Sequence, residues 1–228
     1  MITTTALTRA AGLSAVAGGL LFLGVQIGHP HLDVEFATTT EFTVRQSVKI
    51  GFTVLSLVGI TGVYLRQVRQ VGVLGLVGYL LLSAGYLGIM STAFVAAYVL
   101  PSIAGTDPAY VADVLAAASN GRASGDIGLL QTALDAQGVG YLLGSLLLGI
   151  ALYRARVVAR WAAALLAVSG VLSVALAVMP DAFYRLLAVP HAVALIALGY
   201  SLWVVTRPGG APVTPRVTTA ELSTAGVG

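Results

Sequence analysis

Five side chains of this sequence could carry acid–base chemistry, and all of them flank long apolar runs. They are Asp135, Asp33, Glu35, His29 and His191. A carboxyl group at a lipid boundary holds its proton better than one in water, because burial disfavours the charged form. Such a carboxylic acid could protonate an apolar substrate, and a histidine could return the proton or take the final one. The spacing therefore points to proton transfer at one face of a membrane.

A second set of side chains could bind the substrate of such a reaction. Its members are Arg45, Lys49, Tyr86, Phe94, Tyr98, Gln131, Tyr141 and Tyr184. Tyr79, Tyr86 and Phe94 are spaced by seven and eight residues, which predicts one aromatic stripe along a helix. Aromatic ring faces stabilise cations, so the stripe could wall a cavity. A plain helix-packing seam would produce the same pattern.

Lys49 is the most deeply placed charge, and Asp135 is close behind it. Charges inside a membrane are costly. Three interpretations follow: an ion pair between Lys49 and Asp135 that locks two helices, a Lys49 chain that reaches back to the interface, or a contact with substrate or a proton. The sequence does not choose between them.

The segment His29-Pro30-His31-Leu32-Asp33 invites comparison with a metal site. Alternate residues of an extended segment face the same way, and His191 could supply a further nitrogen ligand. No metalloenzyme spacing accompanies these residues, so we predict no metal and no cofactor. His191 follows Pro190, which favours the first turn of a helix, where a neutral imidazole acts as a hydrogen-bonding group or base.

The elements that position these residues follow from composition. The 228 residues are 57% hydrophobic and only 9% charged, with a mean hydropathy of +0.93. Soluble domains carry about 25% charged residues, so a soluble globular enzyme is excluded. The lack of cysteine excludes thiol chemistry and Cys-ligated metals. A net charge of +3 gives no reason to expect nucleic acid as a partner.

Six runs are long enough to cross a bilayer core, which takes about 20 apolar residues as helix. They are residues 10–28, 47–65, 71–100, 136–153, 157–179 and 191–206. The fold class is therefore an all-α, polytopic membrane bundle, with one domain over residues 1–206. Residues 108–119 form an amphipathic helix at the outer surface, begun by Asp107 as its N-cap. Residues 207–228 form a disordered cytoplasmic tail.

Charge asymmetry gives the orientation. With the N-terminus inside, eight of the twelve basic residues lie on the inner side and eight of the nine acids on the outer side. Basic residues favour the cytoplasmic side, so both termini are predicted in the cytoplasm of a multi-pass protein of a bacterial inner membrane. The Gly24-x-x-x-Gly28 and Gly140-x-x-x-Gly144 motifs predict close helix packing, and they leave homo-oligomerisation open.

Three segments carry a resemblance to known proteins: Gly28-His29-Pro30, the run from Gly59 to Gln67, and Arg160-Trp161-Ala162-Ala163. They resemble the small six-span membrane proteins of actinobacteria, most of them of unknown function, over about residues 10–206. In length, span number and scattered carboxylates and aromatics, the chain is also similar to bacterial membrane-bound terpene cyclases of indole and other hybrid terpenoid pathways. This second resemblance implies a lipid-soluble isoprenoid substrate and acid-initiated cyclisation.

Three functions stay in competition. The first is a membrane-embedded enzyme that cyclises a prenylated, lipid-like small molecule in a pocket between the helices. The second is a non-enzymatic membrane subunit, sensor or immunity-type protein that binds a partner or lipid at its outer face. The third is a transporter for a small solute, which would need a hydrated path through the bundle.

Overall fold

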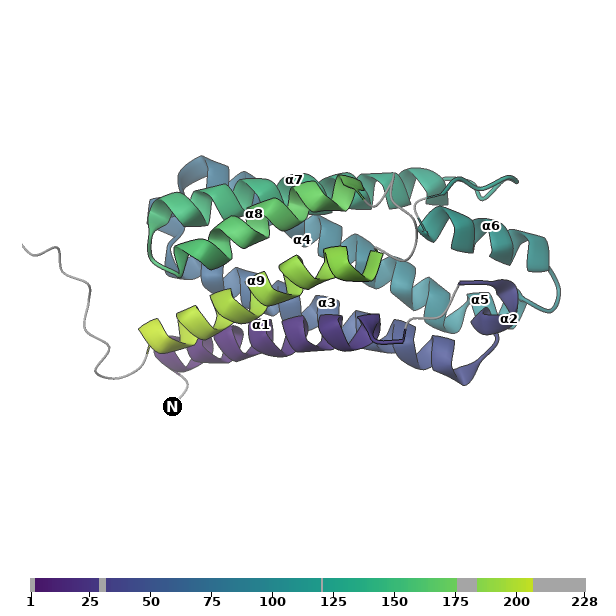
Figure 1. The fold of residues 1–228 in the computed structure, drawn as a ribbon, viewed down its shortest axis with the longest axis horizontal. Coiled ribbons are helices and arrows are strands. Elements are labelled where there is room, and N and C mark those ends of the chain that lie inside the picture. Colours follow the sequence, from purple (N-terminus) through teal and green to yellow (C-terminus); the bar gives the residue numbers. More distant parts are fainter. Residues whose placement is uncertain (1–2, 29–31, 120, 176–183, 207–228) are drawn as a thin grey trace, which may run out of the picture.

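The computed structural model of the chain describes residues 3–28, 32–119, 121–175 and 184–206, and every regular element in these ranges is a helix (Figure 1). The helices are α1 (Thr4–Gln26), α2 (Val34–Ala37), α3 (Thr40–Arg66), α4 (Val68–Tyr98), α5 (Leu100–Ile103), α6 (Pro108–Ala118), α7 (Leu130–Ala155), α8 (Arg160–Ala175) and α9 (Tyr184–Val205). The prediction of an all-α fold is confirmed.

The six long helices form a closed ring. In chain order, α1 packs on α3, α3 on α4, α4 on α7, α7 on α8 and α8 on α9, and α9 returns to pack on α1. The helices run along the same long axis in Figure 1. Side chains that point into this ring therefore meet residues from every part of the chain.

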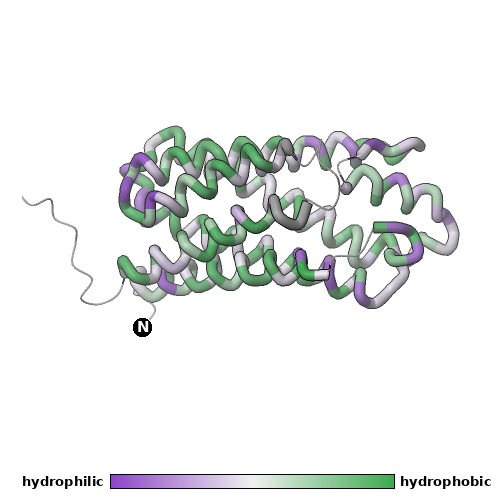
Figure 2. The backbone as a smooth tube through the Cα atoms, viewed as in Figure 1, coloured by the Kyte–Doolittle hydropathy of each residue, from purple (hydrophilic) through white to green (hydrophobic). Residues whose placement is uncertain are grey.

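Within the described ranges, five helices are long and apolar enough to cross a membrane: α1, α3, α4 with α5, α7 and most of α9. The sixth predicted span, 157–179, corresponds to α8, of which 16 residues are described. Large apolar side chains also point outward, with Val73 at 77% and Leu80 at 54% exposure. Much of the tube in Figure 2 is hydrophobic along the bundle, which is compatible with helices that cross a membrane.

Most long helices begin earlier than their apolar runs suggested. α3 begins at Thr40 because the Thr39 hydroxyl accepts a hydrogen bond from Phe42 N at 3.2 Å, which caps the helix. α7 begins at Leu130, six residues before the predicted start. Polar residues expected in connecting loops, Gln131 and Asp135 among them, therefore lie on helix.

Close packing of α4 on α7 depends on glycine. A Cβ atom on Gly85 would lie 2.8 Å from the backbone nitrogen of Tyr141, and one on Gly144 would overlap the backbone of Leu82. The close approach predicted from Gly140 and Gly144 is thus confirmed. Gly24, by contrast, has open space where its Cβ would be, so the prediction for its motif is wrong.

The two ends of the bundle differ. One end, here called the roofed end, is covered by α2, α5, α6 and residues 121–129 (Figure 1). α6 occupies almost the predicted range and is capped by Asp107, whose carboxylate accepts from Tyr110 N at 3.0 Å. Its apolar face is buried in a small second core rather than spread on the surface. The other end holds the α3–α4 and α7–α8 turns and is called the arginine end.

Candidate functional site

A cavity of about 150 Å³ lies below the roof, between α3, α4, α6 and α7. Its polar lining residues are Gln46, Lys49, Thr92 and Gln137. Its apolar lining residues are Leu32, Ile89, Ala93, Val95, Ala96, Leu100, Val114, Leu115, Ala118, Leu130 and Leu134. The space corresponds to about ten water-sized atoms. We call it the Lys49 cavity.

Lys49 is the only charged side chain among the described residues that line the cavity, and it is half-buried. Among the described residues it has neither a carboxylate partner nor a hydrogen-bonding partner, whereas Arg45, one turn away, pairs with Glu41. Arg45 adds a second positive charge near Lys49. An ammonium group held in an apolar setting without a counter-charge is destabilised, so this cavity favours an anion.

The predicted ion pair between Lys49 and Asp135 is absent from the described part of the chain. Asp135 is exposed, does not line the cavity, and accepts a hydrogen bond from Gln131 Nε2 at 3.2 Å. The two residues are separated because α7 begins at Leu130 and turns Asp135 outward, while Gln137 faces the cavity instead.

Two amides stand beside Lys49. Gln46, one turn before it on α3, is only 6% exposed, yet its amide has no partner among the described residues. Thr92 Oγ1 on α4 lies 3.2 Å from Gln137 Oε1 and 3.1 Å from Gly88 O, and its one proton can reach only one of these acceptors. Gln137 has no further hydrogen-bonding partner in the same ranges. Buried polar groups normally form hydrogen bonds. An ammonium and two amides within one apolar cavity could together bind a carboxylate or phosphate.

A second polar centre, the His191 cluster, lies deeper in the ring. His191 Nε2 is 2.6 Å from the Tyr86 hydroxyl, and His191 Nδ1 is 3.0 Å from Ser169 Oγ. All three side chains are buried. The expected place of His191 in a first helical turn is wrong, because α9 begins at Tyr184 and Pro190 lies inside it. Transmembrane helices tolerate internal proline, and the extra turns carry His191 into the core.

One arrangement of protons satisfies every hydrogen bond of the cluster. The Ser169 hydroxyl donates to Leu166 O at 2.7 Å. Its oxygen then accepts from His191 Nδ1–H, and His191 Nε2 accepts from the Tyr86 hydroxyl. A neutral imidazole satisfies both contacts. The Ser56 hydroxyl also approaches Tyr86 but makes no well-aligned hydrogen bond.

Aromatic rings surround this chain of hydrogen bonds. Tyr141 lies 4.7 Å from the His191 ring, centroid to centroid, and Phe22 lies 6.0 Å from it. Phe52 stacks on Phe22 at 4.4 Å and meets Tyr86 edge-on at 5.8 Å. All six long helices thus contribute to the cluster: α1, α3, α4, α7, α8 and α9.

The Lys49 cavity lies about one helical turn from the His191 cluster, or about 5 Å along the axis. Three helices show the relation. Lys49 precedes Phe52 by three residues on α3, Ile89 follows Tyr86 by three on α4, and Gln137 precedes Tyr141 by four on α7.

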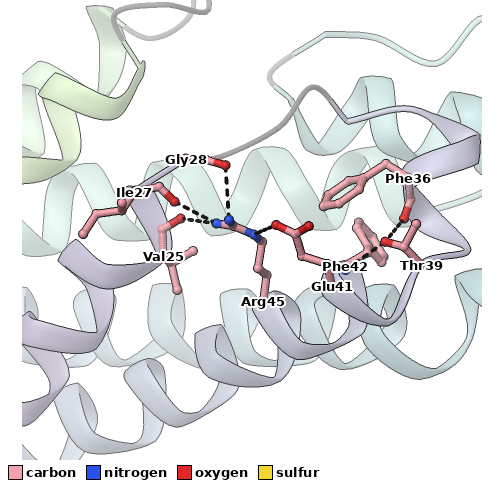
Figure 3. Close-up of polar contacts among 8 residues, drawn as sticks. All are labelled: Val25, Ile27, Gly28, Phe36, Thr39, Glu41, Phe42 and Arg45. Carbon is pink, nitrogen blue, oxygen red and sulfur yellow. Dashed lines mark hydrogen bonds and ion pairs between the residues drawn. The ribbon is translucent and has the colours of Figure 1, made fainter.

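Arg45 was expected to bind substrate, but in the structure its side chain forms hydrogen bonds with the end of α1 and with Glu41. Its guanidinium donates to the carbonyl oxygens of Val25, Ile27 and Gly28, each at 3.1 Å, while its Nε donates to Glu41 at 2.8 Å (Figure 3). These carbonyls belong to the end of α1, where they have no partner within the helix. Arg45 therefore caps α1 and ties it to α3.

Asp33 and Glu35, both expected to be acids of the site, are exposed and do not line the Lys49 cavity. Asp33 caps α2, accepting from Phe36 N at 2.7 Å. Gln131 also lies outside the cavity lining, and its carbonyl oxygen accepts from Ala123 N at 3.3 Å.

The residues of the predicted aromatic stripe do not all face the same side of α4. Tyr86 is fully buried, whereas Phe94 and Tyr98 are 55% and 51% exposed. Eight residues of a straight helix advance about 80° beyond two full turns, so Phe94 faces outward while Tyr86 faces the core. The Tyr98 hydroxyl instead lies 2.9 Å from Ser47 Oγ and joins α4 to α3.

His29, His31 and the side chain of Tyr184 lie outside the described residues. Within those residues, no group of three metal-binding side chains is present. The alternative in which His29 and His31 share an ion with His191 is therefore not tested, and the expectation of no metal stays a prediction. The disordered tail over residues 207–228 also stays a prediction, because it too lies outside the described residues.

Sequence reasoning missed Gln46, Thr92, Ser169, Phe22 and Phe52 as members of these two centres. Gln46 carried a signal: it lies three residues before Lys49, which places both on one helical face. Comparison with protein-family models, curated proteins and solved structures gave no match, so function is inferred here from the two centres themselves.

Proposed function

We propose that the chain is a six-span membrane protein that binds a lipid-soluble molecule with an anionic head group in the Lys49 cavity. The observation that carries this proposal is the unpartnered ammonium of Lys49 in an apolar cavity, beside the unpartnered amide of Gln46. Both termini lie in the cytoplasm, and the roofed end faces outward, because described basic residues concentrate at the opposite end.

The chemistry of the lining defines the class of ligand. Lys49, Gln46 and Gln137 offer N–H donors to a carboxylate or phosphate. Leucine, alanine and valine side chains supply the rest of the wall and suit a short hydrocarbon segment. The cavity holds about ten atoms, so a longer tail would leave it toward the bilayer. A lipid-like amphiphile of this kind matches both parts of the lining.

The proposal is tested by titrating the purified full-length chain with octyl phosphate, octanoate and uncharged 1-octanol. We expect saturable binding of one or both anions and none of 1-octanol. Lys49→Met should weaken anion binding at least tenfold, because a charge-assisted hydrogen bond contributes about 1.5–3 kcal/mol. Lys49→Arg should recover part of the affinity, since it restores the charge.

The matched control is Arg122→Gln, which removes an exposed charge from the roofed end without touching the cavity lining. It should leave the affinity unchanged. Equal binding of 1-octanol and octyl phosphate, or full anion affinity in Lys49→Met, would contradict the proposal.

The second candidate is an enzyme that cyclises an isoprenoid substrate, and the His191 cluster favours it. Its rings lie outside the lining of the Lys49 cavity, so this candidate requires that the bound substrate separates them, after which their faces could stabilise a carbocation. The Tyr86 oxygen could accept the proton released when a double bond forms and pass its own proton to His191 Nε2, 2.6 Å away. The imidazolium could return that proton through Tyr86 to the next substrate and so start its cyclisation, which leaves no net gain or loss of protons. In this form the Lys49 cavity would anchor the anionic head of the same substrate.

This second candidate predicts that membranes containing the chain convert a prenylated aromatic acid into a cyclised isomer of equal mass. Tyr86→Phe should abolish turnover, while Asp135→Asn, Asp33→Asn and Glu35→Gln should retain it, because those carboxylates lie outside the cavity lining. If one of the three carboxylate variants loses turnover, the substituted residue is the acid that protonates the substrate.

A further inference from the structure

The arginine end carries a dense positive surface. Five arginines there are exposed and a sixth, Arg9, is half-buried. The exposed ones are Arg66, Arg69, Arg154, Arg156 and Arg160. They belong to the α3–α4 and α7–α8 turns, which lie at the same end of the bundle in Figure 1, where α4 packs on α7 along their length.

No described carboxylate lies near this surface. The seven Asp and Glu residues of the described ranges all lie at the roofed end, on or beside α2, the start of α3, α6 and the start of α7. The only ion pair found in those ranges, Arg45 with Glu41, is there too. The arginine charges are therefore not neutralised by the described part of the chain.

Two of these guanidinium groups form cation–π contacts with aromatic rings. Arg160 lies over the ring of Tyr153 at 4.2 Å, and Arg9 lies over Trp203 at 5.6 Å. Trp161, next to Arg160, is 60% exposed. Tryptophan and tyrosine favour the head-group level of a bilayer, so the rings place this surface at the depth of the lipid phosphates.

The helix lengths agree with that depth. α3 has 27 residues, or about 40 Å at 1.5 Å per residue, against about 40–45 Å for a bilayer including its head groups. Arg66 ends this helix and Arg69 lies in the first turn of the next. Their guanidinium groups therefore reach the phosphate layer, where arginine can bind phosphate oxygens with two parallel hydrogen bonds.

We propose that the arginine end is a binding surface for anionic phospholipids, formed jointly by the α3–α4 and α7–α8 turns. It recognises the phosphate groups of lipids with net negative charge in preference to zwitterionic lipids. The inference rests on the membrane-spanning part of the proposed function, but not on ligand binding in the Lys49 cavity, which lies at the opposite end of the bundle.

The test uses the full-length chain in nanodiscs with equal parts phosphatidylglycerol and phosphatidylcholine, followed by native mass spectrometry of the lipids it retains. We expect phosphatidylglycerol to be retained at least fivefold over phosphatidylcholine. Arg66→Gln/Arg156→Gln should reduce that preference at least threefold, and Arg66→Lys/Arg156→Lys should fall between, because it keeps the charge but not the paired donors.

Arg122→Gln, which removes an exposed charge at the roofed end, is the control and should keep the preference. Circular dichroism would confirm that each variant is as helical as the parent chain. Equal retention of both lipids, an unchanged preference in Arg66→Gln/Arg156→Gln, or equal loss in Arg122→Gln would overturn the inference. Displacement of phosphatidylglycerol by inorganic phosphate would overturn it too, by assigning the surface to free anions.

Discussion

The Lys49 cavity and the His191 cluster differ in how many of their polar groups have a hydrogen-bonding partner and in how much free space surrounds them. In the cluster, both imidazole nitrogens have partners, and rings from several helices fill the space around them. In the cavity, one turn away, an ammonium and an amide have no described partner, and space for about ten atoms remains. The imidazole is therefore held by its partners, although the nearby Ser56 hydroxyl has none among the described residues, whereas Lys49 and Gln46 point their donors at open space that a ligand could occupy.

Two glycines of α7 differ in how closely other residues surround them. Gly144, near the level of the cluster, would overlap the Leu82 backbone if it carried a Cβ. Gly138, next to Gln137 at the level of the cavity, has open space at that position. Helices α4 and α7 are thus in close contact at Gly144, whereas Gly138 lies on the exposed face of α7. This contrast gives four predictions, from the largest expected effect to the smallest.

The largest effect is expected from removing the centre of the cluster. His191→Leu deletes both hydrogen bonds and leaves the buried Tyr86 hydroxyl without an acceptor. Its expected cost is about 2–4 kcal/mol in the free energy of unfolding, measured on the full chain in detergent. Tyr86→Phe should cost less, about 1–2 kcal/mol, because the ring contacts stay. If the two costs simply add in Tyr86→Phe/His191→Leu, the hydrogen bond between the two residues is not what stabilises the cluster.

The next effect tests the packing contrast directly. Gly144→Ala should destabilise the chain by about 1–3 kcal/mol, because the helices must separate to admit one methyl group. Gly138→Ala, at an exposed position of the same helix, should leave stability unchanged or raise it by up to about 1 kcal/mol, because alanine favours a helix over glycine. Thermal unfolding of both variants measures the difference. Equal effects at the two positions would show that α4 and α7 are not in close contact at Gly144.

A smaller effect of opposite sign is expected at Lys49. Lys49→Met should raise the stability of the ligand-free chain by up to about 1 kcal/mol, because it removes an unpaired charge from an apolar setting. Stability and binding would then move in opposite directions in one variant. A clear loss of stability in ligand-free Lys49→Met would mean that the ammonium has a structural partner.

The smallest effect is expected at Asp135. Its carboxylate is exposed and bonds only Gln131 in the described ranges, so Asp135→Asn should alter stability by less than about 0.5 kcal/mol. Binding of octyl phosphate should be unaffected. A tenfold change in that binding would place Asp135 in the site after all.

Much of the architecture could be predicted from residue patterns, because the apolar runs and the capping residues act locally. The range of α6 and its Asp107 cap are examples. The position of His191 could not be predicted in this way. Proline at 190 suggested a helix start, and only packing against the other helices shows that α9 continues past it.

The site was predicted in part. Lys49, Tyr86, Tyr141 and His191 do belong to the two centres, since each lies on the inner face of its helix. The carboxylates and Arg45 do not, because caps and turns use them near the helix ends. Whether a charged side chain caps a helix or enters a cavity depends on the helix rotation, and a rotation is set by tertiary contacts.

The most direct test is an experimental structure of the full chain with octyl phosphate bound. The central claim predicts the phosphate group within hydrogen-bonding distance of Lys49 Nζ and of at least one of Gln46 and Gln137, with the alkyl chain against Ile89 and Leu134. A probe found only on the outer surface of the bundle, with Lys49 paired to a carboxylate of the chain, would contradict it.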